Sequence, residues 1–129
     1  MKRILIADDS KVARDTAKRT FSQAFPAETF EFDEASDGQE LYSKAAAGGN
    51  WALIATDWNM PGMTGIEVLE RLKAEGKLKG LPPVGFATTE STAEMQAAAG
   101  QIPTSFFVVR PYSPESFKTA FGAILDKKP

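Results

Sequence analysis

Four short apolar runs, each followed at once by a polar side chain, constrain this chain more than any other feature. Their short length and lack of apolar-polar alternation predict strands that are covered on both faces in a parallel sheet. Because parallel strands end at one edge of a sheet, the polar residues that follow are expected to meet there, where open α/β sheets bind ligands. The runs are residues 4–7, followed by Asp8 and Asp9; 53–56, followed by Asp57; 84–87, followed by Thr88; and 106–109, followed by Arg110.

The segments between these runs show helical spacing of apolar residues. Phe30 and Phe32 alternate with acidic residues, which predicts a further, half-buried strand at an edge of the sheet. We expect the third strand to begin at Trp51. The pattern is therefore five strands alternating with five helices, which predicts an α/β fold with a five-stranded parallel sheet and helices on both faces. The helices are expected after Ser10, Asp37, Thr64, Ser91 and Ser113.

Composition narrows the class of function. The 129 residues, 43% of them hydrophobic and 25% charged, suit one domain over residues 1–129. The absence of cysteine and histidine excludes disulfides, a thiol nucleophile, an imidazole base and the usual zinc sites. A signal sequence and a run of eighteen apolar residues are absent, so we expect a cytoplasmic protein without membrane insertion.

Charge gives no general reason for binding nucleic acid, because the formal net charge is -2 and the sequence pI is about 5.2. A basic cluster does follow the first strand, and acidic Asp15 lies within it. We interpret this cluster as a solvated helix face that could also help to dock an acidic partner. Its members are Lys11, Arg14, Lys18 and Arg19.

The polar residues at the strand ends suit phosphoryl chemistry. Asp8, Asp9 and Asp57 would repel one another in a cleft, so a hard cation such as Mg²⁺ is expected among them. Asp57 is the candidate nucleophile, with Thr88 and Arg110 placed to neutralise phosphoryl charge. Taken singly, each Asp could be a turn former or helix cap, and Arg110 could pair with any carboxylate. The joint pattern favours the site.

With these residues and the motif Asp57-Trp58-Asn59-Met60-Pro61-Gly62-Met63-Thr64-Gly65, the chain resembles a response-regulator receiver domain of the CheY-like type. The likeness runs from Arg3 to Asp126 and includes Thr88 and the Arg110-Pro111 dipeptide. It implies a flavodoxin-like sheet in the order 2-1-3-4-5, and phosphorylation of Asp57 by a histidine kinase or histidine phosphotransferase. It also implies Mg²⁺ or Mn²⁺ held by Asp8 or Asp9, by Asp57 and by the Asn59 carbonyl.

The resemblance further implies roles in switching. Thr88 would bind the phosphoryl group. Phe107 would turn inward and so remodel a protein-binding surface on helix 4, strand 5 and helix 5. Asn59 and Glu90 would tune hydrolysis of the aspartyl phosphate. We accordingly expect a phosphoacceptor signalling protein, monomeric or weakly dimeric, that acts on a downstream protein target and is no enzyme for a separate substrate.

Three other readings compete with this one. A haloacid-dehalogenase phosphatase needs a second Asp two residues after its nucleophile, where Ser10 follows Asp8, and it needs room for a cap domain. An FMN-binding flavodoxin needs a phosphate loop rich in Ser, Thr and Gly after the first strand. The third is a receiver-like binding module without productive phosphorylation, because Arg110 stands where the family has lysine and the two side chains are not interchangeable at a phosphoryl site.

Overall fold

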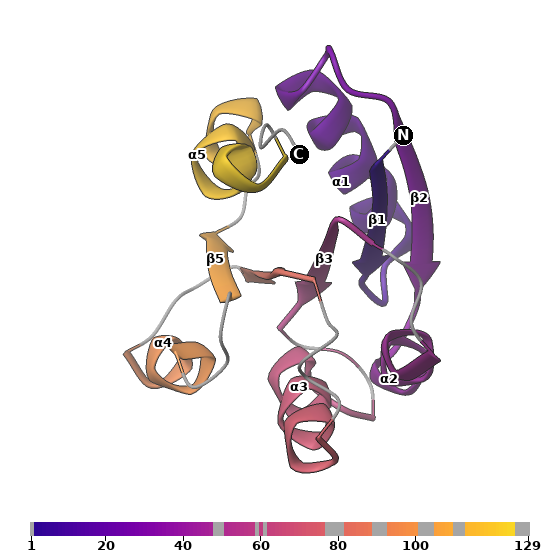
Figure 1. Cartoon of the computed structure of the whole chain (residues 1–129), viewed down its shortest axis with the longest axis vertical. Helices are drawn as coiled ribbons and strands as arrows, with labels where there is room; N and C mark the ends of the chain where they lie inside the picture. The colour runs from indigo at the N-terminus through magenta and orange to yellow at the C-terminus, as the bar shows by residue number, and fades with distance from the viewer. Residues whose placement is uncertain are drawn as a thin grey trace.

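The strands form one parallel sheet in the computed structural model, which describes residues 2–47, 51–58, 60, 62–76, 82–88, 93–100, 105–109 and 113–125. The strand order is β2-β1-β3-β4-β5, with β2 at one edge and β5 at the other (Figure 1). This confirms the expected sheet order and the edge position of the Phe30 strand. The strands are β1 (Lys2–Ala7), β2 (Phe30–Ala35), β3 (Leu53–Asp57), β4 (Val84–Thr88) and β5 (Ser105–Val109).

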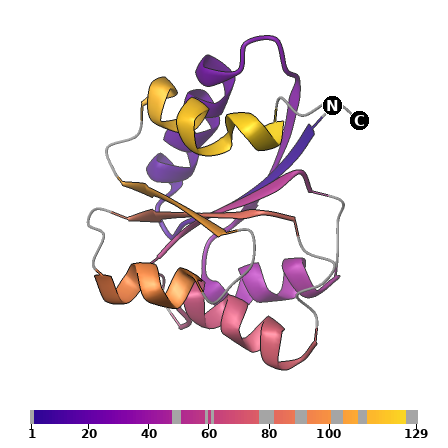
Figure 2. The ribbon, with the colours of Figure 1, turned by 60° about the vertical axis from the view of Figure 1, so that its left-hand side comes forward.

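Helices cover both faces of the sheet, as the alternating pattern predicts (Figure 2). Helices α1 and α5 pack together on one face, and α2, α3 and α4 lie on the other. The architecture is the flavodoxin-like α/β fold. No helix of the described residues combines the length and the hydrophobicity needed to cross a membrane. The helices are α1 (Lys11–Ala24), α2 (Gly38–Ala47), α3 (Gly65–Ala74), α4 (Ala93–Gly100) and α5 (Pro114–Leu125).

Strand β1 shows why its sequence is apolar throughout. Successive side chains of a strand point to opposite faces. Leu5 and Ala7 belong to the core beneath α2 and α3, whereas Ile4 and Ile6 belong to the core beneath α1 and α5. All four are buried. Strand β1 therefore contributes side chains to both hydrophobic cores. Its burial on both faces fixes the position at which the following residue, Asp8, leaves the sheet.

Helix starts are set by local capping. The hydroxyl of Ser10 accepts the N–H of Ala13 at 3.2 Å, and Thr64 forms a reciprocal capping box with Glu67. Ser113 caps α5 by accepting the N–H of Ser116 at 3.0 Å. These three starts were predicted, and the capping places each helix directly after the loop that follows a strand.

The predicted start of the third strand is wrong by two residues, because β3 begins at Leu53 and not at Trp51. Trp51 is nevertheless buried, with 8% of its surface exposed, and belongs to the core under α2 and α3. Its apolar character reflects burial just before the strand. The strand extends one residue further than expected at its other end, so that Asp57 is its last residue.

Candidate functional site

Three carboxylates meet at the carboxyl edge of the sheet. One oxygen from each of Asp8, Asp9 and Asp57 lies within 4.8 Å of the others. The register explains the meeting, since Ala7 pairs with Thr56 and each is followed by an aspartate. Asp8 is buried, Asp57 is partly buried and Asp9 is exposed. This confirms the predicted convergence of the two strand ends and gives a set of oxygen donors of the kind that a hard divalent cation prefers.

Asp8 is held by its own surroundings. Its backbone N–H donates to the carbonyl of Ala35 at 3.0 Å, which extends the β1–β2 ladder past the end of the strand. Its Oδ1 accepts the N–H of Ser10 at 2.9 Å. Only 4% of its surface is exposed. The direction of this carboxylate is thus set by the turn that starts α1 and not by solvent.

The segment after Asp57 returns tightly to the end of β3. The N–H of Gly65 donates to the carbonyl of Trp58 at 2.9 Å, which closes the turn. Gly62 within it has a φ of 83°, a conformation that favours glycine. A Cβ atom on Gly65 would lie 2.5 Å from the backbone oxygen of Asp57, so only glycine lets α3 begin so close to the strand.

The substitution Gly65→Ala tests this close approach. Its methyl group would displace the Asp57 peptide, because a backbone oxygen cannot move away as a flexible side chain could. We expect a loss of about 1–3 kcal/mol in the free energy of unfolding, measured with urea. We also expect weaker Mg²⁺ binding. Gly62→Asn is the matched control, since it lies in the same turn, has open space at the Cβ position and Asn tolerates positive φ. Equal stability of Gly65→Ala and wild type would contradict the contact.

Two predicted switch residues are placed by the backbone of the sheet. Thr88 is the last residue of β4, one position beyond Ala87, the register partner of Asp57. Phe107 pairs with Phe86 across β4 and β5. Thr88 therefore ends its strand at the same edge as Asp57, as expected. The predicted residues Asn59, Glu90 and Arg110 lie outside the described residues.

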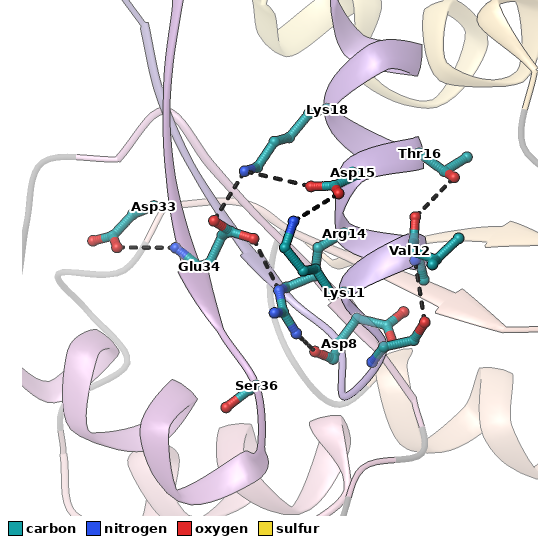
Figure 3. A network of polar contacts seen from close by, with 12 residues as sticks. Asp8, Lys11, Val12, Arg14, Asp15, Thr16, Lys18, Asp33, Glu34 and Ser36 are labelled. Carbon is teal, nitrogen blue, oxygen red and sulfur yellow. Dashed lines mark hydrogen bonds and ion pairs between the residues drawn. The ribbon is translucent and has the colours of Figure 1, made fainter.

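In the basic cluster of α1, the side chains of Lys11, Arg14 and Lys18 form ion pairs, and the expectation of a solvated face is wrong for Arg14 (Figure 3). The Arg14 side chain is only 14% exposed and its Nε donates to Glu34 Oε1 at 2.9 Å. Lys18 binds the other oxygen of Glu34, also at 2.9 Å, while Lys11 pairs with Asp15. Sequence reasoning missed the partner on β2, which lies 20 residues away. The only signal in the sequence was an acidic residue near the end of an edge strand.

Hydrogen bonding by Lys18 is the main cause that lowers the pKa of Glu34, and Arg14 lowers it further, against the opposing effect of burial. The stabilisation from Glu34 is therefore complete above its ordinary pKa of about 4.5 and is lost as pH falls through the lower folded-state value. We expect Glu34→Gln to reduce stability at neutral pH by about 0.5–1 kcal/mol, since the pair is partly exposed.

At an acidic pH, well below the ordinary pKa of about 4.5, the difference between wild type and Glu34→Gln should shrink, because protonation of the wild-type carboxylate removes the charge on which its ion pairs depend. Urea unfolding at the two pH values measures it. Glu70→Gln, which removes an exposed carboxylate from α3, is the matched control. A difference that stays constant between the two pH values would contradict the assignment of the lowered pKa to this network.

The chain matches a known protein family over most of its length. The family described as "Response regulator receiver domain" matches residues 4–121. The chain belongs to this family. Its relatives include the chemotaxis protein CheY of Pseudomonas aeruginosa, which is 31% identical over 125 residues, covering 97% of each chain. Chemotaxis protein CheY1 of Helicobacter pylori is 28% identical over 123 residues, covering 95% of this chain and 96% of the relative.

Solved structures agree with the receiver assignment. The chemotaxis response regulator CheY4 of Vibrio cholerae superposes with a TM-score of 0.77 at 27% identity, covering 96% of this chain and 98% of that one. The chain is therefore a CheY-like receiver domain, the type of module that acts in two-component signalling. The predicted family and fold class are both confirmed.

Proposed function

We propose that this receiver domain accepts a phosphoryl group on Asp57, in a Mg²⁺-dependent reaction, from the phosphohistidine of a histidine kinase or histidine phosphotransferase. The observation that carries the proposal is the convergence of Asp8, Asp9 and Asp57 within 4.8 Å at the carboxyl edge of a receiver sheet. In the transfer, a carboxylate oxygen of Asp57 forms the new P–O bond. The P–N bond breaks and its electron pair stays on the imidazole nitrogen.

The donor set fits a hard divalent cation, Mg²⁺ or Mn²⁺, because it offers three carboxylates and neither nitrogen nor sulfur. Asp8 and Asp9 would hold the cation, together with one oxygen of Asp57 and, by family likeness, the Asn59 carbonyl. When bound, the cation supplies positive charge against the phosphoryl oxygens. The Asp57 oxygen that is not needed for the cation is then free to attack phosphorus. Thr88, the last residue of the adjacent strand β4, would donate a hydrogen bond from its hydroxyl to the transferred group.

A partner surface adjoins this site. Val12 lies in the first turn of α1, directly after the two aspartates and Ser10, and 75% of its surface is exposed. Among the described residues, it is the one large hydrophobic side chain that is exposed to solvent. An exposed apolar group in the helix turn that follows Asp8 and Asp9 suits the docking of a phosphohistidine-bearing protein, which must bring its imidazole to Asp57.

Binding of a downstream protein would use the side of the sheet formed by β5, the edge strand opposite β2. Strand β5 is the edge strand next to β4, and both α4 and α5 pack on it (Figure 1). Thr88 pairs with Val109, so the carboxyl end of β4 is hydrogen-bonded directly to β5. Phosphorylation would shift a two-state equilibrium of this α4–β5–α5 surface, through contacts that are better in one state, and so change its affinity for a downstream protein.

The test is intact-mass spectrometry after incubation with phosphoramidate or acetyl phosphate, with Mg²⁺ or with EDTA. We expect a gain of one phosphoryl group with Mg²⁺ and none with EDTA. Peptide mapping after borohydride reduction should place the modification on Asp57. An absence of any gain, with Mg²⁺ binding intact, would overturn the proposal and support a receiver-like module that signals without phosphorylation, with Arg110→Lys as the first reversion to make.

A further inference from the structure

Arg14 connects the edge strand to the acidic site. Besides its bond to Glu34, its Nη1 donates to the backbone carbonyl of Asp8 at 2.8 Å (Figure 3). The planar guanidinium thus binds two acceptors from different elements at once, one on β2 and one at the end of β1. Because the side chain is 14% exposed, water competes little for these bonds.

The carbonyl that Arg14 holds is structurally sensitive. It lies one residue beyond the end of β1, whose last residue is Ala7. The carbonyl of Asp8 and the N–H of Asp9 also belong to one rigid peptide plane, so rotation of this plane would redirect both residues. The N–H of Asp8 is fixed by Ala35 and its carboxylate by Ser10. The bond from Arg14 is a further constraint on the residue, and it acts on the plane that joins the two aspartates.

Glu34, which binds the Arg14 side chain, is itself held in place by a second cation. Glu34 is held by Lys18 at 2.9 Å, and Lys18 also lies 3.9 Å from Asp15 on its own helix. Glu34 belongs to β2, whose register with β1 places it beside Ile6. The edge strand therefore supplies an anchored carboxylate that sets the orientation of the guanidinium, and the guanidinium in turn sets the Asp8–Asp9 peptide.

We propose that Arg14 is a positioning residue for the metal site, which holds the Asp8–Asp9 peptide in the orientation that binds Mg²⁺ and is anchored for this by Glu34. The inference rests on the Mg²⁺ dependence in the proposed function and adds to it a partner outside the metal ligands. Residues that orient metal ligands in this way typically account for a 10- to 100-fold effect on metal affinity.

If Arg14 acted only through its charge, its removal would change Mg²⁺ affinity in the direction opposite to that expected from positioning. Arg14 places a positive charge close to the carboxylates, so its removal should tighten Mg²⁺ binding if only electrostatics mattered. A positioning role predicts weaker binding. Arg14→Met therefore separates the two explanations by the sign of the change. Arg14→Lys keeps the positive charge but loses the planar guanidinium that binds two acceptors at once. Any loss of Mg²⁺ affinity in this variant therefore comes from geometry.

The experiment measures the Kd for Mg²⁺ by isothermal titration calorimetry in wild type, Arg14→Met, Arg14→Lys and Lys11→Met. Lys11→Met is the matched control, because it removes one positive charge from the same helix but its Nζ pairs with Asp15 and not with Asp8. We expect Kd to rise about tenfold in both Arg14 variants and to stay unchanged or fall in Lys11→Met. Circular dichroism and urea unfolding without Mg²⁺ check the fold.

A second readout separates positioning from general loss of structure. With phosphoramidate, the Mg²⁺ concentration for half-maximal phosphorylation of Arg14→Lys should rise about tenfold, while the rate at saturating Mg²⁺ stays within about twofold of wild type. Wild-type affinity in folded Arg14→Lys, or tighter binding in folded Arg14→Met, would overturn the inference. If Arg14→Met does not fold, Arg14→Lys decides alone. Failure of wild type to bind Mg²⁺ would instead overturn the proposed function.

Discussion

Asp57→Asn is expected to abolish phosphorylation by phosphoramidate and by any phosphohistidine donor. The carboxamide is a much weaker nucleophile than the carboxylate and carries no charge to share with a cation. The same substitution removes one of three carboxylates whose oxygens lie within 4.8 Å of one another. We therefore also expect the Mg²⁺-free variant to be more stable than wild type by about 1 kcal/mol or more, since like charges at this spacing repel.

Intact-mass spectrometry measures the first effect, and urea unfolding in EDTA measures the second. Asp15→Asn is the control, because it removes a carboxylate from α1 that pairs with Lys11 outside the acidic site. This control should be phosphorylated like wild type and should gain no stability. A phosphoryl group on Asp57→Asn would mean that another residue accepts it. An unchanged stability in EDTA would mean that the three carboxylates do not share a repulsive site.

Phe21→Ala is expected to have the largest effect on stability. Phe21 is fully buried in the core beneath α1 and α5, and its ring centroid lies 4.6 Å from that of Phe117 and 5.7 Å from that of Phe121. It also contacts Phe30 and Phe32 on β2. Truncation would leave a cavity among the rings that α5 and the edge strand β2 contribute. We expect a loss of about 3–5 kcal/mol, because the surrounding rings can relax only in part.

Urea unfolding and calorimetry at neutral pH test this, with a fall of about 10–20 °C in Tm expected for a chain of this length. Phe32→Ala is the control, since Phe32 belongs to the same aromatic cluster but is only partly buried on the edge strand. Its cost should be well below that of Phe21→Ala, because solvent can fill the space. Equal losses would show that Phe21 is not the centre of this core.

Some features of this protein follow from local sequence. The apolar runs predict the strands, because a strand buried on both faces has no polar positions. Capping residues predict helix starts, as Thr64 and Ser113 show, since a hydroxyl at the N-cap satisfies backbone groups a few residues away. The convergence of Asp8, Asp9 and Asp57 also follows, because the ends of parallel strands share one edge. The sheet order came from resemblance to a family, and the structure confirms it.

Only the tertiary structure decided which distant groups meet. The bond from Arg14 to Glu34 spans 20 residues and depends on β2 lying beside β1 in a particular register. A basic residue on a helix has the same local pattern whether it faces solvent or a carboxylate, so its sequence predicts a solvated face. The close approach of Gly65 to the Asp57 carbonyl is likewise hidden, because a capping box can begin a helix at any distance from a strand. Local chemistry sets the elements and strand ends of this receiver, whereas packing and register select the partners that orient its acidic site.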